Sequence, residues 1–192
     1  MGSNSSHPEL TEERLEEYSV LTYLSKEEIL YLMNKFQSID ANKVLENFDH
    51  RFGQEEIIGK FDILKNNPFR ERIFHVFSSK KDGCFSFEDL LDLCSVMSLE
   101  CPAKVKAVWA FQIFDIDNDK KISAGDIINI IDLLTSGCQN PDNFIDKQSK
   151  EEIAKIVMNE IKFNKCGNIN LQEFEFVLSR LPEFKSTFYF RL

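Results

Sequence analysis

The sequence has few of the features from which disulfide frameworks, zinc sites and membrane spans are built. Its five cysteines are widely spaced and form no CxxC pair, which argues against a disulfide framework and against a zinc site. No apolar run approaches the ~20 residues that span a bilayer, and the N-terminus lacks the apolar segment of a secretory signal. These absences predict a soluble chain in a reducing, cytoplasmic compartment.

Basic clusters and catalytic patterns are equally scarce. The chain has 23 basic and 32 acidic side chains, and its formal net charge of -9 would repel a phosphate backbone, so we expect no nucleic-acid partner. Only three histidines are present, none with a carboxylate and a nucleophile at readable spacing, and no glycine-rich phosphate loop occurs. The chain is therefore not expected to be an enzyme.

A repeated pattern is what the sequence does contain. Three segments each read as an apolar helix, a twelve-residue polar loop and a second apolar helix, and they span residues 69–97, 106–134 and 151–178. Each loop has an apolar residue at its eighth position, Phe85, Ile122 or Ile169, where paired loops could join through a short strand. This is the EF-hand arrangement.

A fourth, degenerate copy is expected near the start, because EF-hands pair to bury their open faces. Ser25 and Glu28 are spaced as a capping box before an apolar helical face. The segment that follows, residues 37–54, is too long and too poor in spaced acids to be a metal loop. We therefore predict a structural hand over residues 25–65. The fold class is then all-α, with two lobes and four EF-hands of which the first two are degenerate.

The predicted organisation has five parts. They are an N-terminal extension (1–24), an N-lobe with hands 1 and 2 (25–98), a linker (99–103), a C-lobe with hands 3 and 4 (104–181) and an apolar tail (182–192). Pro102 marks the linker as a break between helices. Ser149 and Glu152 are spaced to cap the helix that enters hand 4.

The third loop has the residues of a metal site at every ligating position. An EF-hand supplies oxygens from positions 1, 3, 5, 7, 9 and 12. Here these positions are Asp115, Asp117, Asp119, the backbone carbonyl of Lys121, Ser123 and Asp126. The spacing predicts that the acids converge on one divalent cation, Ca²⁺ or Mg²⁺.

Two departures in this loop should tune the site. Asp126 replaces the usual Glu at position 12, and its shorter side chain favours lower coordination and the smaller Mg²⁺. Lys120 occupies position 6, where a positive φ costs a residue with a β-carbon roughly 1 kcal/mol. We expect an intact site that is weak for Ca²⁺ and filled by Mg²⁺ at rest.

The other two loops are poorer in ligands. In the fourth loop Lys162 replaces the leading carboxylate, so we expect no metal there. The alternative is a weak second site made of Asn164, Asn168 and Glu173. The second loop has Lys80 in a ligand position and is predicted to be structural.

The N-terminus matches a lipidation pattern. Gly2 and Ser6 fit M-G-x-x-x-[ST], the pattern for N-myristoylation, and a chance match is the alternative. One myristoyl chain binds membranes only marginally, and no second anchoring signal lies nearby. If Gly2 is acylated, we expect reversible contact with membranes and a cytoplasmic protein found peripherally at them.

Several stretches together resemble the calcium- and integrin-binding protein family. They are LTYLSKEEIL, NPFRERIFHVFS, FSFEDLLDLCSVMS, AFQIFDIDND and the C-terminal LPEFKSTFYFRL. The resemblance covers nearly the whole chain from Leu21 to Leu192, and Asp126 at position 12 of the third hand also looks like that family. The fourth loop departs from the family, whose members usually keep it acidic.

The resemblance implies a non-enzymatic adaptor or auxiliary subunit, myristoylated in some members. Its expected partners are amphipathic or membrane-proximal helices of integrin tails and of transmembrane channel-like mechanotransduction proteins. A groove between EF-hand helices accepts such a helix through i, i+3 and i+4 anchors. Candidate wall residues are Leu133, Leu134, Val157, Met158 and Phe176, for each of which a place in the core is the alternative. The apolar tail either fills this groove or completes the core.

Two other functions stay open at this point. A phosphatase regulatory subunit like calcineurin B is also acylated and built of four EF-hands, but that family generally has four acidic loops and only one survives here. A myristoylated calcium sensor of the neuronal type is the third alternative, and the single competent loop weighs against it.

Overall fold

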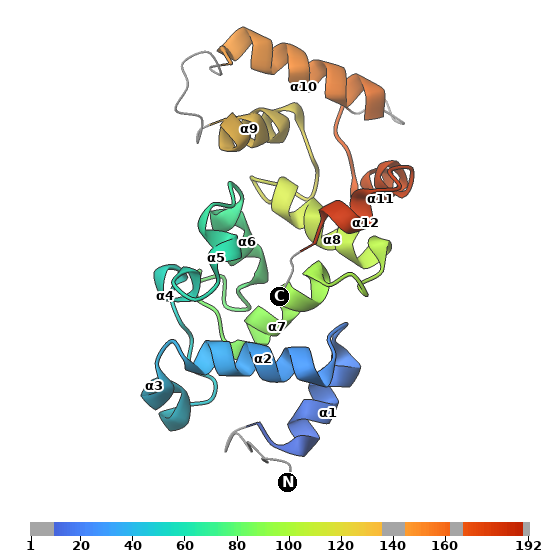
Figure 1. The fold of residues 1–192 in the computed structure, drawn as a ribbon. Coiled ribbons are helices and arrows are strands. Elements are labelled where there is room, and N and C mark those ends of the chain that lie inside the picture. The colour runs from blue at the N-terminus through green and yellow to red at the C-terminus, as the bar shows by residue number, and fades with distance from the viewer. Residues whose placement is uncertain (1–9, 136–144, 162–166, 190–192) are drawn as a thin grey trace. The chain divides into compact units, whose positions relative to one another are not determined.

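The computed structural model describes residues 10–135, 145–161 and 167–189, and these residues are mostly helical (Figure 1). The helices are α1 (Glu12–Leu21), α2 (Lys26–Gln37), α3 (Ala41–Glu46), α4 (Gln54–Ile58), α5 (Asp62–Lys65), α6 (Arg70–Phe77), α7 (Phe87–Met97), α8 (Ala103–Phe114), α9 (Ala124–Thr135), α10 (Lys147–Ile161), α11 (Leu171–Ser179) and α12 (Phe184–Thr187). The predicted all-α class is confirmed. Within the described ranges, no helix is long and apolar enough to cross a membrane.

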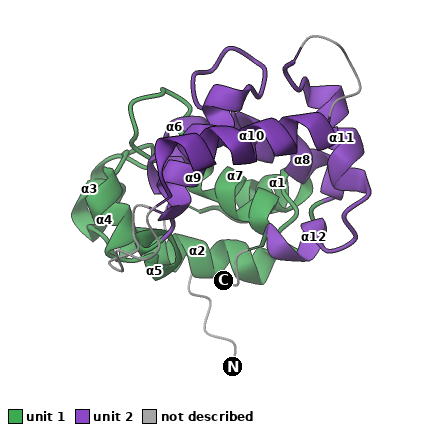
Figure 2. Cartoon of the chain, turned by 90° about the horizontal axis from the view of Figure 1, so that it is seen from above, with its two compact units in different colours: residues 1–66, 77–101, 189–192 green, residues 67–76, 102–188 purple. Residues whose placement is uncertain are grey.

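The helices form two compact units (Figure 2). The described residues within 1–66, 77–101 and 189–192 make the first unit, and those within 67–76 and 102–188 make the second. The chain changes unit at several points, one of which lies between Cys101 and Pro102. Residues 67–76, which precede the second loop, group with the second unit.

The first unit is built around α2 and α7. α2 begins at the predicted capping box, because Glu28 N donates to Ser25 Oγ at 3.2 Å and Ser25 N donates to Glu28 Oε2 at 2.7 Å. On the apolar face of α2, Phe36 is fully buried. Its ring centroid lies 5.0 Å from that of Phe52 and 5.6 Å from that of Phe87. Aromatic packing therefore joins the entering helix of hand 1 to its own loop and to the exiting helix of hand 2.

A short helix divides the segment that the sequence indicated as one eroded loop. α3 begins where Asp40 Oδ1 accepts hydrogen bonds from Asn42 N at 3.1 Å and Lys43 N at 3.2 Å. Farther along, Phe52 pairs with Phe85 through two backbone hydrogen bonds of 2.9 Å. Phe85 is position 8 of the second loop, so this pairing aligns residues 45–56 as the twelve-residue loop of hand 1.

All four hands close with the same cap between loop positions 9 and 12. In each, the backbone N–H at position 9 donates to the carboxylate at position 12, which lies in the first turn of the exiting helix. The pairs are Gly53–Glu56 at 3.0 Å, Ser86–Asp89 at 3.0 Å, Ser123–Asp126 at 2.8 Å and Asn170–Glu173 at 3.0 Å. This cap fixes where α4, α7, α9 and α11 begin, and it is made of protein groups alone.

The second unit packs hands 3 and 4 around one core. Ile122 and Ile169, each at position 8 of its loop, form a bridge through two backbone hydrogen bonds of 2.8 Å. The surrounding core cluster consists of Ala110, Phe111, Ile122, Met158, Ile169 and Phe174. α9 lies against α10, and α8 lies against α11 (Figure 1). The β-structure in the described part of the chain is limited to isolated bridges, and no extended strand forms there.

The helix that enters hand 4 starts earlier than the sequence predicts. α10 begins at Lys147, and Ser149 lies inside its first turn. Ser149 N donates to Asp146 Oδ1 at 2.9 Å, and Ser149 Oγ donates to Asp146 Oδ2 at 2.9 Å. The predicted cap of Ser149 with Glu152 is therefore wrong. Asp is as strong a capping residue as Ser, and Asp146 comes first along the chain.

The tail is held against α8 by a buried lysine. Lys106 has no exposed surface, and its Nζ donates to the carbonyl oxygens of Lys185 at 3.2 Å and Phe188 at 2.5 Å. Phe184 and Phe188 stack at 5.8 Å between ring centroids and pack against the core cluster. Up to Phe188 the tail therefore completes the core of the second unit. Phe190 lies outside the described residues.

Candidate metal centre in the third EF-hand

Two helix ends position the acids of the third loop. The backbone leaves α8 at Asp115, whose N–H still donates to Phe111 O at 2.9 Å. Asp126 lies in the first turn of α9, where the helix dipole favours a carboxylate. The loop between them folds back, so positions 1 and 12 face each other.

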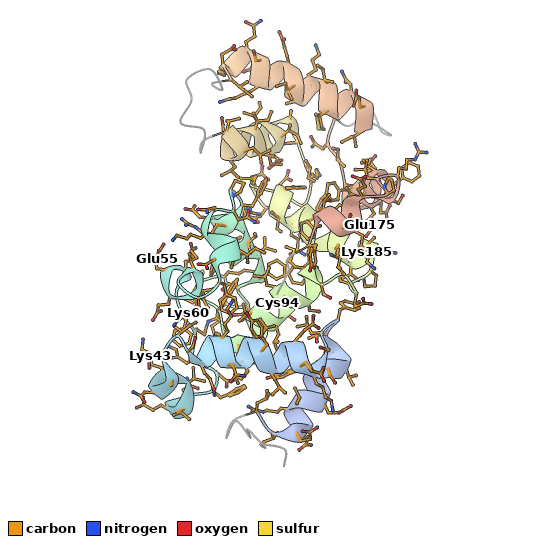
Figure 3. All side chains as sticks on the ribbon, viewed as in Figure 1. Lys43, Glu55, Lys60, Cys94, Glu175 and Lys185 are labelled. Atoms are coloured by element: carbon orange, nitrogen blue, oxygen red, sulfur yellow. The ribbon has the colours of Figure 1, made fainter. Side chains whose placement is uncertain are left out.

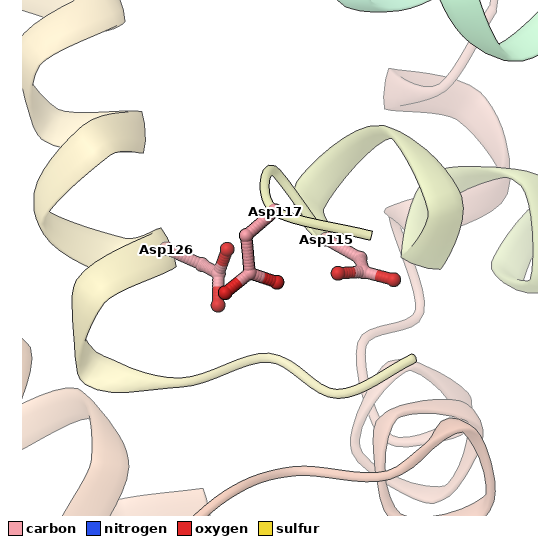
Figure 4. A group of neighbouring side chains, drawn as sticks. All are labelled: Asp115, Asp117 and Asp126. Atoms are coloured by element: carbon pink, nitrogen blue, oxygen red, sulfur yellow. The ribbon is translucent and has the colours of Figure 1, made fainter. Parts of the chain in front are cut away.

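Three carboxylates converge in this loop (Figure 4). One oxygen from each of Asp115, Asp117 and Asp126 lies within 4.8 Å of the others. Asp115 and Asp126 are 5% and 2% exposed, whereas Asp117 is exposed to solvent. Oxygens that ligate one Ca²⁺ at 2.3–2.6 Å can lie at most about 5 Å apart. The spacing of the three carboxylates therefore fits a single cation.

Backbone N–H groups hold two of the acids in place. Asp126 Oδ1 accepts from Ile116 N at 2.9 Å, and Asp126 Oδ2 accepts from Ser123 N at 2.8 Å and from Ser123 Oγ at 2.7 Å. Asp115 Oδ2 accepts from Lys120 N at 3.0 Å. The loop itself thus fixes the directions of these carboxylates.

The electrostatics of the loop also suit a cation. Burial raises the pKa of Asp115, the neighbouring carboxylates raise it further, and the hydrogen bond from Lys120 N lowers it. A raised pKa means that holding this carboxylate in its charged form costs free energy in the folded loop. A divalent cation placed among the carboxylates would remove that cost.

The remaining predicted ligands lie around this group. Asp119 is exposed, and its Oδ1 accepts from Lys121 N at 2.8 Å. Ser123 Oγ is turned toward Asp126, where it also caps α9. Lys120 has a φ of 67°, so the sixth position takes the left-handed conformation that the sequence indicates, without glycine.

An arginine from outside the third hand supports its loop. Arg72, on α6, belongs to the second unit, and its guanidinium donates to Gln112 O at 2.7 Å and Asp115 O at 2.5 Å. The same guanidinium donates to the side chain of Asn118 at 3.2 Å. No loop motif indicates this residue. The one sequence feature that could have indicated Arg72 is its place among the apolar positions of the helix that precedes the second loop.

The five predicted groove residues occupy different environments. Met158 is 4% exposed and belongs to the core cluster, whereas Leu134 and Phe176 are 55% and 43% exposed. Leu133 and Val157 are half-buried. Of the five, Leu134 and Phe176 are therefore the two whose apolar side chains are open to a partner.

Phe176 lines a hollow of about 340 Å³ formed by α8, α11 and α12. Ala107 and Phe184 contribute to its apolar wall, and Glu175 and Lys104 add charged groups. Figure 3 labels Glu175 on α11 and Lys185 on α12. Lys155 and Met158 line a second, smaller hollow of about 240 Å³ beside α10.

Comparison with known proteins places the chain in a family. No family model matches it. Calcium and integrin-binding family member 3 of Homo sapiens is 34% identical over 95% of this chain and 96% of its own length. The chain belongs to the calcium and integrin-binding family. Member 2 of Drosophila melanogaster is 32% identical over 95% of the chain, and member 3 of Mus musculus is 38% identical over 71%. The predicted family resemblance is confirmed.

In this member of the calcium and integrin-binding family, the fourth loop shows no comparable acidic group among its described residues. Gly167 has a φ of 76° at position 6, and Glu173 is engaged in the helix cap with Asn170. Asn168 is half-buried. Asn164 and Gly2 lie outside the described residues. Across the described ranges, the third loop has the only cluster of three or more potential metal-binding side chains.

Proposed function

We propose that this protein binds one Ca²⁺ or Mg²⁺ ion in its third hand. The convergence of Asp115, Asp117 and Asp126 within 4.8 Å is the observation that carries the proposal. Asp126 is one CH₂ shorter than Glu, and both its oxygens already accept N–H bonds. Ligation through a single oxygen is therefore expected, which suits octahedral Mg²⁺ better than Ca²⁺. The proposed resting state has Mg²⁺ in this loop, with Asp119 and the Lys121 carbonyl as further ligands.

We propose further that the protein is a non-enzymatic adaptor for an amphipathic helix in the cytoplasmic segment of a membrane protein. Its relatives are named for calcium and integrin binding, so an integrin-like tail is the first candidate partner, with a transmembrane channel-like protein as the second. Exposed Phe176, at the hollow of about 340 Å³, supports this role. The net charge of -9 favours a basic helix. An acyl chain on Gly2 would add reversible membrane contact.

Calorimetric titration tests the metal site. Metal-free protein is titrated with Ca²⁺, first without Mg²⁺ and then at physiological Mg²⁺, while Trp109 fluorescence follows the helix that enters the loop. We expect one site per chain, weakened for Ca²⁺ by Mg²⁺. Asp117→Asn should weaken it about tenfold, because it removes one negative charge from the ligands of the ion without disturbing the core. Asp62→Asn, an exposed acid on α5, is the control. Equal binding by wild type and Asp117→Asn would contradict the site.

Anisotropy titration of a labelled peptide tests the partner. The peptide is the membrane-proximal helix of an integrin cytoplasmic tail. Phe176→Asp should weaken its binding about tenfold or more, because a charge replaces an apolar anchor. Leu45→Asp, which alters a 55% exposed side chain in the first unit, should leave it unchanged. If both variants bind the peptide as wild type does, the hollow is not the binding site. If wild type binds neither this helix nor that of a transmembrane channel-like protein, the adaptor proposal is wrong.

A further inference from the structure

The guanidinium of Arg51 lies inside the second EF-hand loop. This residue comes from the loop of hand 1, next to the Phe52–Phe85 bridge. Its side chain is 12% exposed. One terminal nitrogen, Nη1, donates to Asp89 Oδ2 at 2.7 Å and to Ser79 Oγ at 3.0 Å.

The second terminal nitrogen makes the remaining contacts. Nη2 donates to Ser78 Oγ at 2.9 Å, to Asp82 Oδ1 at 2.9 Å and to the carbonyl oxygen of Cys84 at 2.6 Å. Ser78, Asp82, Cys84 and Asp89 are positions 1, 5, 7 and 12 of this loop. These are four of the positions from which an EF-hand ligates its ion, and position 7 uses its backbone carbonyl as metal-binding loops do. The guanidinium therefore contacts the oxygens that a metal would contact.

The charges of the loop require a cation at this place. The Asp89 side chain is only 4% exposed, and a buried carboxylate without a partner is strongly unfavourable. Lys80, which occupies ligand position 3, is exposed to solvent. The hydrogen bond from Arg51 holds the pKa of Asp82 well below its usual range. Arg51 thus keeps Asp82 ionised and pairs with the buried Asp89, in a loop that lacks a carboxylate at its first position.

The carboxylates that Arg51 contacts also organise the backbone of the loop. Asp89 accepts from Ser79 N at 3.0 Å and from Ser86 N at 3.0 Å. Asp82 accepts from Cys84 N at 2.9 Å. The loop conformation that an ion would impose is thus already present with the guanidinium in place.

We propose that Arg51 is a permanent internal cation of the second hand, supplied by the loop of hand 1 and occupying the position of the metal. Two consequences follow. The second loop keeps its structure at every Ca²⁺ concentration, so hand 2 does not respond to Ca²⁺. Removing the charge of Arg51 exposes a set of oxygens that admits a divalent cation.

Three variants of the full chain test this proposal by calorimetry with Ca²⁺. Arg51→Gln removes the charge and places an amide oxygen in the loop, so we expect one more Ca²⁺ site than in wild type, in the millimolar range. Its melting temperature without metal should fall by about 10 °C and rise again with Ca²⁺. Arg51→Lys keeps the charge and should gain no site. Arg51→Gln with Asp89→Asn should gain none either, because position 12 is then neutral.

Additional Ca²⁺ binding by Arg51→Gln would show that Arg51 occupies a metal position and does not merely form an ion pair. If Arg51→Gln is destabilised but binds no additional Ca²⁺, the residue is only structural and the proposal is wrong. If that variant does not fold, hydrogen exchange of the wild type decides. The amides of Ser79, Cys84 and Ser86 should be equally protected in EDTA and in Ca²⁺. Protection of these amides that requires Ca²⁺ would overturn the proposal.

Discussion

Replacing Lys106 by methionine should release the tail without unfolding the protein. The Lys106 amine is fully buried and donates to the carbonyl oxygens of Lys185 and Phe188. Each hydrogen bond from a charged group contributes about 1.5–3 kcal/mol, so the loss of two should cost the docked tail roughly 3 kcal/mol or more. Methionine has a similar length, and replacing a buried charge by an apolar side chain is often neutral for the rest of the core.

The expected result is a local change. A cost of about 3 kcal/mol increases the open fraction of the tail by roughly a hundredfold. The amides of Thr187 and Phe188, which donate to Glu183 O at 2.9 Å and Phe184 O at 3.0 Å, report this opening by native-state hydrogen exchange. Their protection should fall about a hundredfold. The amide of Ile122, in the bridge of the same unit, should stay protected.

A matched control is available on the same helix. Lys104 is exposed, so Lys104→Met should leave exchange in the tail unchanged. The reasoning fails if Lys106→Met leaves the tail amides as protected as in wild type. It also fails if the Ile122 amide loses protection to the same extent, because the lysine would then support the whole unit and not the tail.

Three further predictions concern the loops. Lys120 has a positive φ, which strains a residue with a β-carbon, and Lys120→Gly should relieve that strain. The melting temperature of the metal-free protein should therefore rise by about 1–3 °C in calorimetry, and a decrease would show that Lys120 is not strained. Arg72→Met should weaken Ca²⁺ binding several-fold in a titration, although Arg72 is not a ligand, and Arg70→Met should not. The pKa of Asp82 is lowered in the folded state, so its contribution is complete above the unfolded value of about 4 and is lost as the pH falls through the folded value. Denaturant unfolding measures the difference in free energy of unfolding between wild type and Arg51→Gln. This difference should persist from pH 7 to pH 5 and shrink below about pH 3. If it stays constant down to pH 2, the ion pair between Arg51 and Asp82 is not its source.

Local patterns predicted the features that depend on local contacts. The Ser25–Glu28 capping box forms as expected, because both of its hydrogen bonds join residues three apart. The carboxylates of Asp115, Asp117 and Asp126 also come together, since loop spacing alone brings them to one side of the turn. In both cases the sequence distance between partners is short.

The features that the sequence did not indicate depend on distant partners or on competing caps. Arg51 and Arg72 act in loops to which they do not belong, so no motif within those loops includes them. The loop of hand 1 is recognisable only through the pairing of Phe52 with Phe85, because only two of its acids, Asp49 and Glu56, lie at ligand positions. At α10, two residue types that cap equally well lie three positions apart, and propensity does not separate Asp146 from Ser149.

The cap between positions 9 and 12 changes what an acidic residue at the end of an EF-hand loop signifies. That carboxylate has two separable tasks, starting a helix and binding an ion. In the second hand, Asp89 performs the first task while a guanidinium occupies the place of the ion. A hand can therefore keep its architecture without its metal chemistry. In such a loop, the acid at position 12 indicates the EF-hand fold, and the residues at positions 1, 3 and 5 indicate whether the loop binds an ion.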